Sequence, residues 1–310
     1  MANPTTSLRM GAAEWGFLLL LALLWAGSFF FYKVLVSALP PLTVVSGRVL
    51  IAALLLNVII LARGGRQPVE PRLWAAFLLM GLLNNIVPYS LIAFGETKVS
   101  SGLASILNAT TPMFTVVVAQ LFTADEKLDV AKIAGLVIGV AGVAVLVGPD
   151  ALAGFGKGDV MGELAVLGAS FSYGLAGVFG RRFRGVPPIT VATFQLTASA
   201  CMAVPLCCLV DRPWTVPMPG AGVWAALIGL AVPSTAIAYL LFFRILARSG
   251  ATNVSLVTLL VPVGAVLLGA WALDETLPRS AWAGVVIIAV GLACLDGRAL
   301  SWLGLRARPA

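Results

Sequence analysis

The chain has 310 residues, of which 60% are hydrophobic and only 11% are charged, with a mean hydropathy of +1.02. Soluble domains carry about 25% charged residues, so this composition excludes a soluble globular protein and indicates lipid as the solvent. The formal net charge of +7 is explained by cytoplasmic loops, and no basic stripe with interleaved aromatic residues indicates nucleic-acid binding.

Several residue types needed for catalysis are absent or badly placed. The sequence contains no His, which removes His-based acid–base catalysis, Ser-His-Asp triads and most zinc sites. The four Cys residues lie in apolar runs without the spacing of a metal site, and no convincing GxSxG or HExxH motif occurs. We therefore expect no catalytic residue, no metal ion and no cofactor.

Ten apolar segments follow one another along the chain. The first, from Trp15, is too long for a signal-peptide core, so we expect it to be retained. Each segment holds about 17–25 mostly apolar residues, enough to cross ~30 Å of hydrocarbon, and backbone groups in lipid must bond internally, which predicts helices. We predict an all-α integral membrane protein. Its ten transmembrane helices are expected at residues 15–36, 42–62, 73–95, 100–121, 130–147, 160–180, 190–210, 222–246, 251–272 and 280–296.

The distribution of Lys and Arg predicts the orientation in the membrane. With a cytoplasmic N-terminus, the inner segments hold fourteen of these residues and the outer loops hold five, and Arg48 within a span completes the 20. Because basic residues concentrate on the cytoplasmic side, this bias predicts that both termini are cytoplasmic.

A long internal repeat divides the chain. Residues 102–146 return near the C-terminus with an offset of 148 to 150 residues, so that Pro262 corresponds to Pro112 and Glu275 to Glu126. A repeat of this length means that the chain consists of two related halves.

Five helices in each half is an odd number, so the second half must enter the membrane inverted. We predict two inverted five-helix repeats, residues 1–150 and 151–310, which meet in a Gly-rich linker. Inverted repeats are a common construction for alternating access, with a binding site near the membrane midplane between the halves.

The first helices of the two halves also correspond. Pro41 aligns with Pro188, and seven residues later Arg48 aligns with Gln195. With the LLWAGSF run before Lys33, the LPPLT turn and the two segments from proline to acidic turn, the sequence resembles the drug/metabolite transporter superfamily, specifically its ten-helix EamA-type exporters. The resemblance covers nearly the whole chain. One departure is that the usual Gly-Glu of the acidic turn reads Asp-Glu in both halves.

The resemblance implies export of amino acids, their derivatives or other small metabolites across a bacterial inner membrane, with aromatic amino acids as one candidate class. The expected partners are a small-molecule substrate and membrane lipid. Gly135 and Gly139 form a GxxxG motif, which either packs within the fold or forms the seam of a homodimer. Monomer and homodimer therefore both stay open.

Polar and aromatic residues near the middle of the spans are candidates to contact substrate, because such groups in lipid need partners or line a cavity. Core packing or hydrogen bonding between helices is the alternative for each of them. We expect a largely uncharged central cavity formed by the first, third, fourth, sixth, eighth and ninth spans. The candidate substrate-binding residues are Trp25, Ser28, Asn84, Asn85, Tyr89, Asn108, Tyr173, Tyr239, Ser255 and Thr258.

Pro112 and Pro262 are candidate gating residues. A proline inside a helix cannot bond the carbonyl four residues earlier, here those of Asn108 and Thr258, and it bends the axis. We expect these bends to bind substrate and to flex as the cavity changes sides. The alternative is a static kink whose carbonyl is satisfied by a neighbouring hydroxyl.

Charged residues inside the spans are few. Arg48 lies about six residues into the second span, roughly 9 Å deep, and an intramembrane charge is a functional candidate by default. Because Gln195 stands at the corresponding position without a charge, we favour snorkelling of Arg48 to the outer headgroups or pairing with a loop carboxylate. No Asp or Glu lies at the middle of a span. Proton exchange through a central carboxylate is therefore disfavoured, and facilitated movement or coupling through another group is expected.

Other functions fit these features less well. An integral membrane enzyme would need a nucleophile or metal cluster at a membrane edge, and a structural or partner-binding membrane protein would not explain the inverted repeat. Within transport, the alternative is a nucleotide-sugar or phosphate-ester carrier. Its cavity would need several cations, and only Arg48 and Lys33 could serve.

Overall fold

Helices joined by short turns make up the residues that the computed structural model describes, which are 10–64, 70–99, 101–123, 130–148, 160–272 and 279–296. The acidic turns at Glu126 and Glu275 and most of the Gly-rich linker lie outside the described residues. The helices in chain order are α1 (Ala12–Val36), α2 (Pro41–Ala62), α3 (Pro71–Gly81), η1 (Leu82–Ile86), α4 (Val87–Glu96), α5 (Ser101–Asn108), α6 (Thr111–Phe122), α7 (Val130–Val147), α9 (Val160–Gly180), η2 (Arg181–Phe183), α10 (Pro188–Val210), η3 (Pro213–Thr215), α11 (Ala221–Ala231), η4 (Val232–Ile237), α12 (Ala238–Ser255), α13 (Val257–Ala272) and α14 (Arg279–Asp296).

Each segment that we predicted to span the membrane is helical in its described part. Among the described residues, seven helical stretches are long and apolar enough to cross a membrane, and two shorter apolar helices, Lys132–Leu146 and Trp282–Cys294, accompany them. The chain is thus a multi-pass membrane protein, whereas ten crossings stay a prediction. The break that we expected between the spans 222–246 and 251–272 is present, because the chain leaves the helical conformation at Gly250, whose φ of 84° and ψ of 174° suit glycine.

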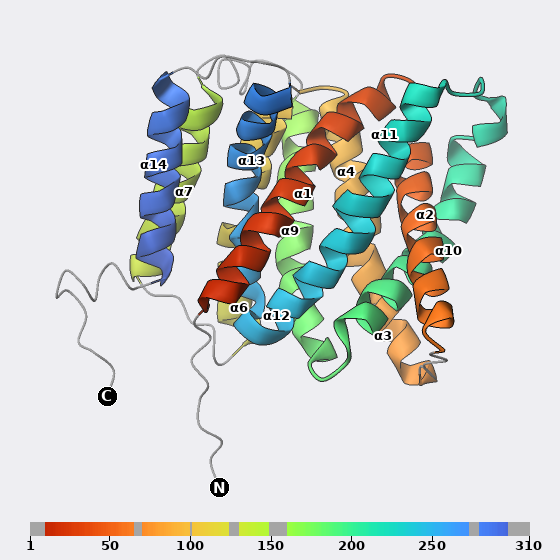
Figure 1. The fold of residues 1–310 in the computed structure, drawn as a ribbon, viewed down its shortest axis with the longest axis horizontal. Helices are drawn as coiled ribbons and strands as arrows, with labels where there is room; N and C mark the ends of the chain where they lie inside the picture. The colour runs from red at the N-terminus through yellow and green to blue at the C-terminus, as the bar shows by residue number, and fades with distance from the viewer. Residues whose placement is uncertain are drawn as a thin grey trace, which may run out of the picture.

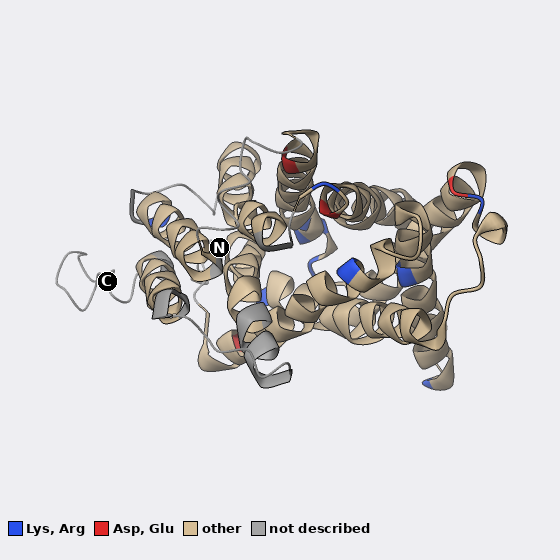
Figure 2. Ribbon diagram, turned by 90° about the horizontal axis from the view of Figure 1, so that it is seen from above, with Lys and Arg blue, Asp and Glu red and all other residues tan. Residues whose placement is uncertain are grey.

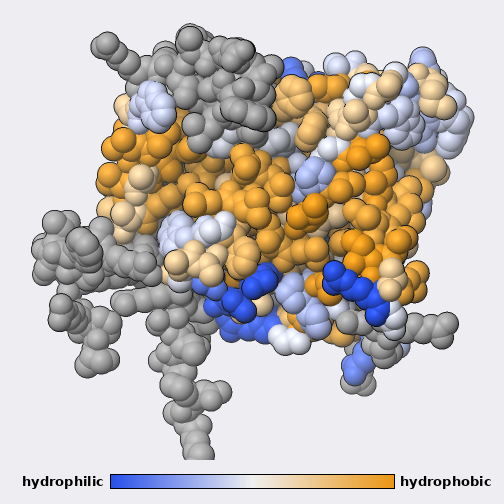
Figure 3. Space-filling view, in the orientation of Figure 1, coloured by the Kyte–Doolittle hydropathy of each residue, from blue (hydrophilic) through white to orange (hydrophobic). Residues whose placement is uncertain are grey.

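Large apolar side chains cover the outside of the helices. Leu209 is 77% exposed and Phe122 is 73% exposed. Figure 3 shows an apolar band across one face, with hydrophilic residues gathered along the lower edge, and Figure 2 shows that most of the ribbon carries no charge. A soluble monomer rarely exposes an apolar patch of this extent. The outer surface therefore suits lipid.

Both halves contain a π-helical turn at corresponding places. α3 continues through η1 into α4, and α11 continues through η4 into α12. Pro88 in the first turn of α4 and Pro233 in η4 lack a backbone N–H, so each interrupts the regular hydrogen-bond ladder. In η4, the hydroxyl of Thr235 donates to the carbonyl oxygen of Leu230 at 2.7 Å and satisfies an acceptor of the wider turn. Such turns are frequent at functional sites.

The helices α7 and α14 pack against each other at one side of the bundle (Figure 1). A Cβ added at Gly142 would lie 2.7 Å from the backbone nitrogen of Ile288, and one added at Gly291 would lie 2.7 Å from that of Gly139. Only glycine permits such an approach of two backbones. The paired residue numbers run in opposite directions, so the two helices are antiparallel. The glycine face of α7 thus packs within the fold, while the choice between monomer and homodimer stays open.

The helices α2 and α10 form a second antiparallel pair. Near the start of α2, Thr43 donates to the carboxylate of Asp211, which follows the end of α10, from its backbone nitrogen at 2.7 Å and from its hydroxyl at 3.0 Å. Further along α2, the amide of Asn57 donates to the hydroxyl of Thr197 at 2.9 Å. Both antiparallel pairs join corresponding helices of the two halves, which is the arrangement that an inverted repeat predicts.

Candidate functional site

A cavity opens between the two halves of the chain. It holds about 740 Å³ of space free of protein atoms, its open side included. The first half contributes lining residues from α1, α2, η1, α4, α5 and α6, and the second half contributes them from α9, α12 and α13. These are the helices expected from the sequence, with the addition of α2.

Most of the candidate residues selected from the sequence come together at this cavity. Asn85 does not line it, and neither do Pro112 and Pro262, although their neighbours Thr111 and Val261 do. A substrate-binding role stays a prediction for the residues that do line it. They are Trp25, Ser28, Asn84, Tyr89, Asn108, Tyr173, Tyr239, Ser255 and Thr258.

Aromatic rings form a fixed part of the cavity wall. The ring of Trp25 stands edge-on to that of Tyr239 with centroids 6.5 Å apart, and its centroid lies 5.8 Å from that of Phe242. Tyr239 and Phe242 also meet edge-to-face at 6.0 Å. Edge-to-face contacts favour a defined ring orientation. The wall is therefore preorganised to hold an apolar or aromatic group.

Two tyrosines at corresponding positions of the halves bond to each other. The hydroxyl oxygens of Tyr89 and Tyr239, which are 150 residues apart, lie 2.6 Å from one another. Tyr239 donates to the side-chain oxygen of Asn85 at 2.5 Å, which leaves its oxygen to accept a proton from Tyr89. The amide nitrogen of Asn85 in turn donates to the hydroxyl of Ser199 at 2.7 Å. Asn85 therefore serves in a buried network that joins the halves rather than in the cavity wall.

The backbone of η1 supplies a second link between the halves. Pro88 cannot donate to the carbonyl of Asn84, and the hydroxyl of Tyr239 lies 3.1 Å from that oxygen. The side chain of Asn84 donates to the side-chain oxygen of Gln195 in α10 at 3.3 Å. Asn84 thus combines a place in the cavity lining with hydrogen bonding between helices, which were the two alternatives for it.

Arg48 lies inside the protein, and our expectation that it snorkels or pairs with a loop carboxylate is wrong. Only 3% of its surface is exposed. Its guanidinium donates to the hydroxyl of Thr235 at 2.6 Å, to that of Tyr32 at 3.0 Å and to the backbone carbonyl of Ser234 at 3.2 Å. Its central carbon also lies 3.8 Å from the ring centroid of Tyr89, a cation–π contact. The side chain turns inward because η4 and the tyrosines give it partners that the membrane surface cannot match.

The guanidinium of Arg48 brings a positive charge to the cavity. It is the one charged group among the residues that line this cavity in the described part of the chain. The groups that contact it are all neutral hydroxyls, a carbonyl and aromatic rings. The cavity is otherwise uncharged as expected, but it has one buried cation that sequence reasoning assigned to the surface.

Two polar side chains in the lining have capacity for a ligand. Ser28 and Asn108 are each 7% exposed. The hydroxyl oxygen of Ser28 and the amide oxygen of Asn108 are buried and make no hydrogen bond in the part of the chain that the structure describes. Buried polar groups normally have a partner, so unpaired ones that face a cavity are candidates to contact a ligand.

The helix break near Pro112 differs from the expected bend. α5 ends at Asn108 and α6 begins at Thr111, so Pro112 lies in the first turn of a new helix, where proline is tolerated. The carbonyl of Asn108 accepts a hydrogen bond from the hydroxyl of Thr111 at 2.7 Å. The expectation of a free carbonyl there is wrong, and the alternative with a neighbouring hydroxyl applies. Pro262, by contrast, lies inside α13.

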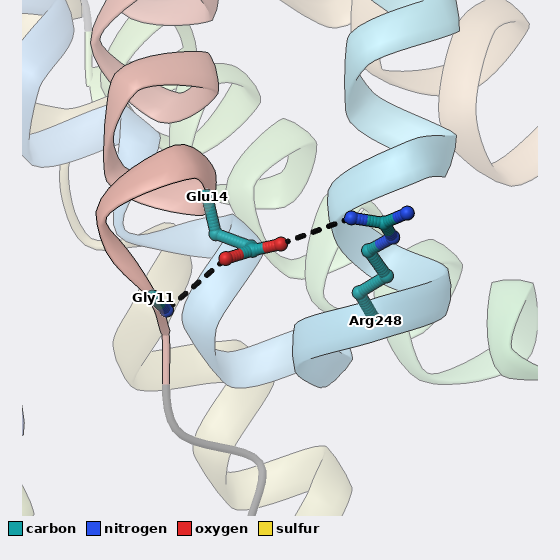
Figure 4. Close-up of polar contacts among 3 residues, drawn as sticks. All are labelled: Gly11, Glu14 and Arg248. Carbon is teal, nitrogen blue, oxygen red and sulfur yellow. Dashed lines mark hydrogen bonds and ion pairs between the residues drawn. The ribbon is translucent and has the colours of Figure 1, made fainter.

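One ion pair joins the ends of two cavity-lining helices. Figure 4 shows Glu14 at the start of α1 and Arg248 near the end of α12, with 3.3 Å between the carboxylate oxygen and the guanidinium nitrogen. Glu14 also accepts a bond from the backbone nitrogen of Gly11 at 3.1 Å. Arg248 stands two residues before the turn at Gly250. The pair therefore couples the first turn of α1 to the break in α12.

The described lining of the cavity offers groups that can bind a molecule. Among the described residues that line it there is no Cys, Asp, Glu or Lys, and the chain has no His. Among the described residues, no group of three His, Cys, Asp or Glu side chains could hold a metal ion. One guanidinium, several hydroxyls and amides and an aromatic wall can hold a small organic molecule in a fixed orientation.

Similar proteins are transporters. The uncharacterized transporter YoaV of Bacillus subtilis (strain 168) is 27% identical over 87% of this chain and 92% of its own. The uncharacterized inner membrane transporter YedA of Escherichia coli (strain K12) is 30% identical over 90% of both chains. A solved crystal structure superimposes with a TM-score of 0.71 at 23% identity, covering 91% of this chain and 97% of that one, which shows a shared fold.

The profile of the EamA-like transporter family matches residues 14–148 and again residues 160–295. Two copies therefore account for most of the 310 residues, one in each half. This family is the one that the sequence resembles in its proline turns and in the segments repeated between the halves. This chain is a membrane transporter and belongs to the EamA-like transporter family.

Proposed function

We propose that this protein is a secondary transporter that exports amino acids or related small metabolites by alternating access. The observation that carries the proposal is the cavity between the halves, which both halves line at the level of their π-helical turns. Transporters built from inverted repeats bind substrate at this kind of interface, beside interrupted helices. The family membership supports transport, and the substrate class follows from the cavity and from the resemblance to EamA-type exporters.

The wall of the cavity favours a small organic substrate. Most of the residues that line it are apolar or aromatic, and a few hydroxyls, amides and one guanidinium stand among them, which is the composition typical of small-molecule sites. The aromatic rings around Trp25 and Tyr239 suit an apolar or aromatic side chain, so aromatic amino acids are the leading candidates. A nucleotide sugar or phosphate ester would bring more negative charge than the single guanidinium of Arg48 can balance.

The proposed orientation has ten spans, inverted halves and both termini in the cytoplasm, in a bacterial inner membrane. The bias of Lys and Arg supports it, and YedA is named as an inner membrane transporter. Single cysteines placed in the turns at Glu126 and Glu275, on a background without the four native cysteines, should label from opposite sides. Labelling of both turns from the same side would contradict the inversion.

The two prolines are proposed to assist the change of access. Pro262 interrupts α13 from inside, and Pro112 starts α6 after a break, so each half has an irregular helix beside the cavity. Alanine at either position should slow transport more than it lowers the yield of folded protein. Alanine at Asn108 or Thr258 should weaken substrate affinity. Unchanged rates and affinities in all four variants would remove both roles.

Counterflow with purified protein in liposomes tests the proposed function. Vesicles preloaded with one compound from a panel of amino acids and metabolites should accumulate the same labelled compound only when they contain the protein. Trp25→Ala should reduce the rate, whereas Trp224→Ala, which changes an exposed tryptophan of α11, should not. Failure of every compound in the panel would refute export of amino acids and related metabolites.

A further inference from the structure

The buried charge of Arg48 raises the question of what balances it. The guanidinium has five N–H donors, and three make the bonds to Thr235, Tyr32 and Ser234. The other two make no hydrogen bond in the described part of the chain, and no carboxylate contacts the group there. A charge held inside a membrane protein is expensive unless it has a counter-charge or a functional partner. The cavity is where such a partner can enter.

We infer that Arg48 is the anion subsite of the cavity and that the transported molecule carries a single carboxylate beside an apolar or aromatic body. This inference rests on the proposed function and narrows it to a class of substrate. The three bonds to neutral partners fix the plane of the guanidinium, and the ring of Tyr89 covers one face at 3.8 Å. The two remaining donors can then bind a carboxylate with its two oxygens, the geometry in which arginine binds carboxylates most strongly.

The corresponding contact in the second half shows that a charge is not needed to hold the helices together. Tyr89 and Tyr239 are 150 residues apart, and the same separation relates Asn84 to Ser234. Arg48 donates to the backbone carbonyl of Ser234, and Gln195 accepts a bond from the side chain of Asn84 at 3.3 Å, so corresponding residues meet through different groups. A neutral amide therefore joins α10 to η1 where a guanidinium joins α2 to η4. The charge at Arg48 is in excess of the structural requirement, which leaves ligand binding as its use.

The other polar groups of the lining indicate what accompanies the carboxylate. The side-chain oxygens of Ser28 and Asn108 lie in the same cavity without a hydrogen bond, and each residue is nine-tenths buried or more. Both oxygens can accept a hydrogen bond from an ammonium or hydroxyl group of the ligand. The charge of one carboxylate matches that of the one guanidinium, whereas the phosphate of an ester carries about −1.5 to −2 and exceeds it. The balance favours a monocarboxylate.

The test compares ligands that lack either the carboxylate or the ammonium group of an amino acid. Phenylalanine, its carboxamide and its 2-oxo acid phenylpyruvate serve as competitors of counterflow in liposomes, or the corresponding three compounds of whichever amino acid gives the fastest counterflow. With wild-type protein, the carboxamide should compete about 30-fold more weakly than the amino acid, the ratio expected when a buried charge pair loses one partner. Phenylpyruvate should keep most of the carboxylate contribution.

Variants of Arg48 should remove this discrimination. Arg48→Gln copies the residue of the second half, and the ratio between amino acid and carboxamide should fall to about twofold or less. Arg48→Lys keeps the charge without the planar fork and should keep part of the ratio. Arg182→Gln removes an exposed arginine at the end of α9 and should leave the ratio unchanged. If Arg48→Gln does not fold, the ratio in Arg48→Lys decides the role of Arg48, and an unchanged ratio in that variant overturns it, while the wild-type protein decides whether a carboxylate is recognised at all.

The possible results separate the two proposals. Transport of an amino acid with equal competition by its carboxamide would overturn the anion subsite and leave the transport function standing. A ratio that persists in Arg48→Gln would show that the carboxylate binds elsewhere, which overturns the role of Arg48. Absence of counterflow for every compound of the panel would refute the proposed function and, with it, the subsite.

Discussion

The two halves of the protein place different residues at the same point of the fold. Arg48 of α2 in the first half donates to the carbonyl of Ser234 in η4 of the second half at 3.2 Å. Gln195 of α10 in the second half accepts a bond from the side chain of Asn84 in η1 of the first half at 3.3 Å. The helices and the π-helical turns correspond, but the charge is present once. Repetition thus determines where helices meet, whereas single side chains determine what the cavity binds. A symmetric backbone with an asymmetric charge gives a site that can orient an asymmetric ligand.

The largest effect is expected when a positive charge is placed at Gln195, the position of the second half that corresponds to Arg48. Gln195 is completely buried, its amide nitrogen makes no hydrogen bond in the described part of the chain, and the residue does not line the cavity. In Gln195→Arg the guanidinium would lack the hydroxyls and the open cavity that Arg48 has. We expect a loss of about 3 kcal/mol of folding free energy, the penalty for an arginine at the middle of a membrane helix.

Thermal unfolding of the purified protein in detergent measures this effect. Arg48→Gln is the matched control, because glutamine is already accepted at the corresponding position, and it should unfold much closer to the wild-type temperature. Equal unfolding temperatures for the two variants would mean that the halves tolerate the charge alike and that the asymmetry has no structural basis.

A second prediction compares helices that line the cavity with the pair of α7 and α14, which does not line it. Leucine at Gly142 would force its Cβ to within 2.7 Å of the backbone nitrogen of Ile288, so the helices must separate. Overpacking of this kind destabilises by about 1–3 kcal/mol. Gly16→Leu in α1 is the control, since nothing lies within 4 Å of the added Cβ there. Gly142→Leu should lower the unfolding temperature without changing which compounds compete in counterflow, and altered selectivity would place α7 in the binding site.

The two tyrosines that bond across the halves should not be equivalent. The hydroxyl of Tyr239 contacts Asn85, the carbonyl of Asn84 and Tyr89, whereas the hydroxyl of Tyr89 bonds to Tyr239 alone among the described residues. Tyr239→Phe leaves the buried oxygen of Asn85 without its donor and should cost about 1–3 kcal/mol, while Tyr89→Phe should cost about 1 kcal/mol. Denaturation in detergent compares them. A larger loss for Tyr89→Phe would reverse the assigned direction of the hydrogen bonds.

The sequence predicts the parts of this fold that depend on hydrophobic runs and on repetition. Apolar segments locate the helices because lipid requires an apolar surface along most of each span. The correspondence of Pro262 to Pro112 indicates that the second half repeats the first. The π-helical turns could not be predicted, since one extra residue in a turn leaves no mark on a segment that is apolar on all sides. Pro88 and Pro233 are the only local signals for them.

The site was predictable in its composition but not in its electrostatics. Residues such as Trp25 and Asn108 stood out because they are polar or aromatic in apolar spans. The sequence could not predict that the side chain of Arg48 points into the protein, because α2 is almost uniformly apolar and its sequence does not show which face meets the other half. The separation of 150 residues between Tyr89 and Tyr239 was a signal in the sequence that pointed to their pairing. Contacts between distant segments, such as Arg48 with Ser234, require the packing itself.

The smallest effect is expected for the ion pair between Glu14 and Arg248. It tests whether charges at the ends of the helices are shielded from salt as the charge at the cavity is. The side chain of Arg248 is 57% exposed, so water and salt screen the pair. Glu14→Gln should lower the unfolding temperature slightly at low salt, and the difference from wild type should vanish near 1 M salt, where the screening length is about 3 Å. The exchange Glu14→Arg with Arg248→Glu should restore only part of the wild-type behaviour at low salt, because it restores opposite charges but removes the acceptor of the Gly11 backbone nitrogen and places a cation at the start of α1. Arg48→Gln provides the contrast, since the salt outside the protein cannot screen a charge enclosed by α2 and η4, and its effect on ligand discrimination should persist at every salt concentration. If the change in unfolding temperature caused by Glu14→Gln is equally independent of salt, the first turn of α1 is enclosed like the cavity. The ion pair would then hold α1 to α12 as firmly as Arg48 holds α2 to η4.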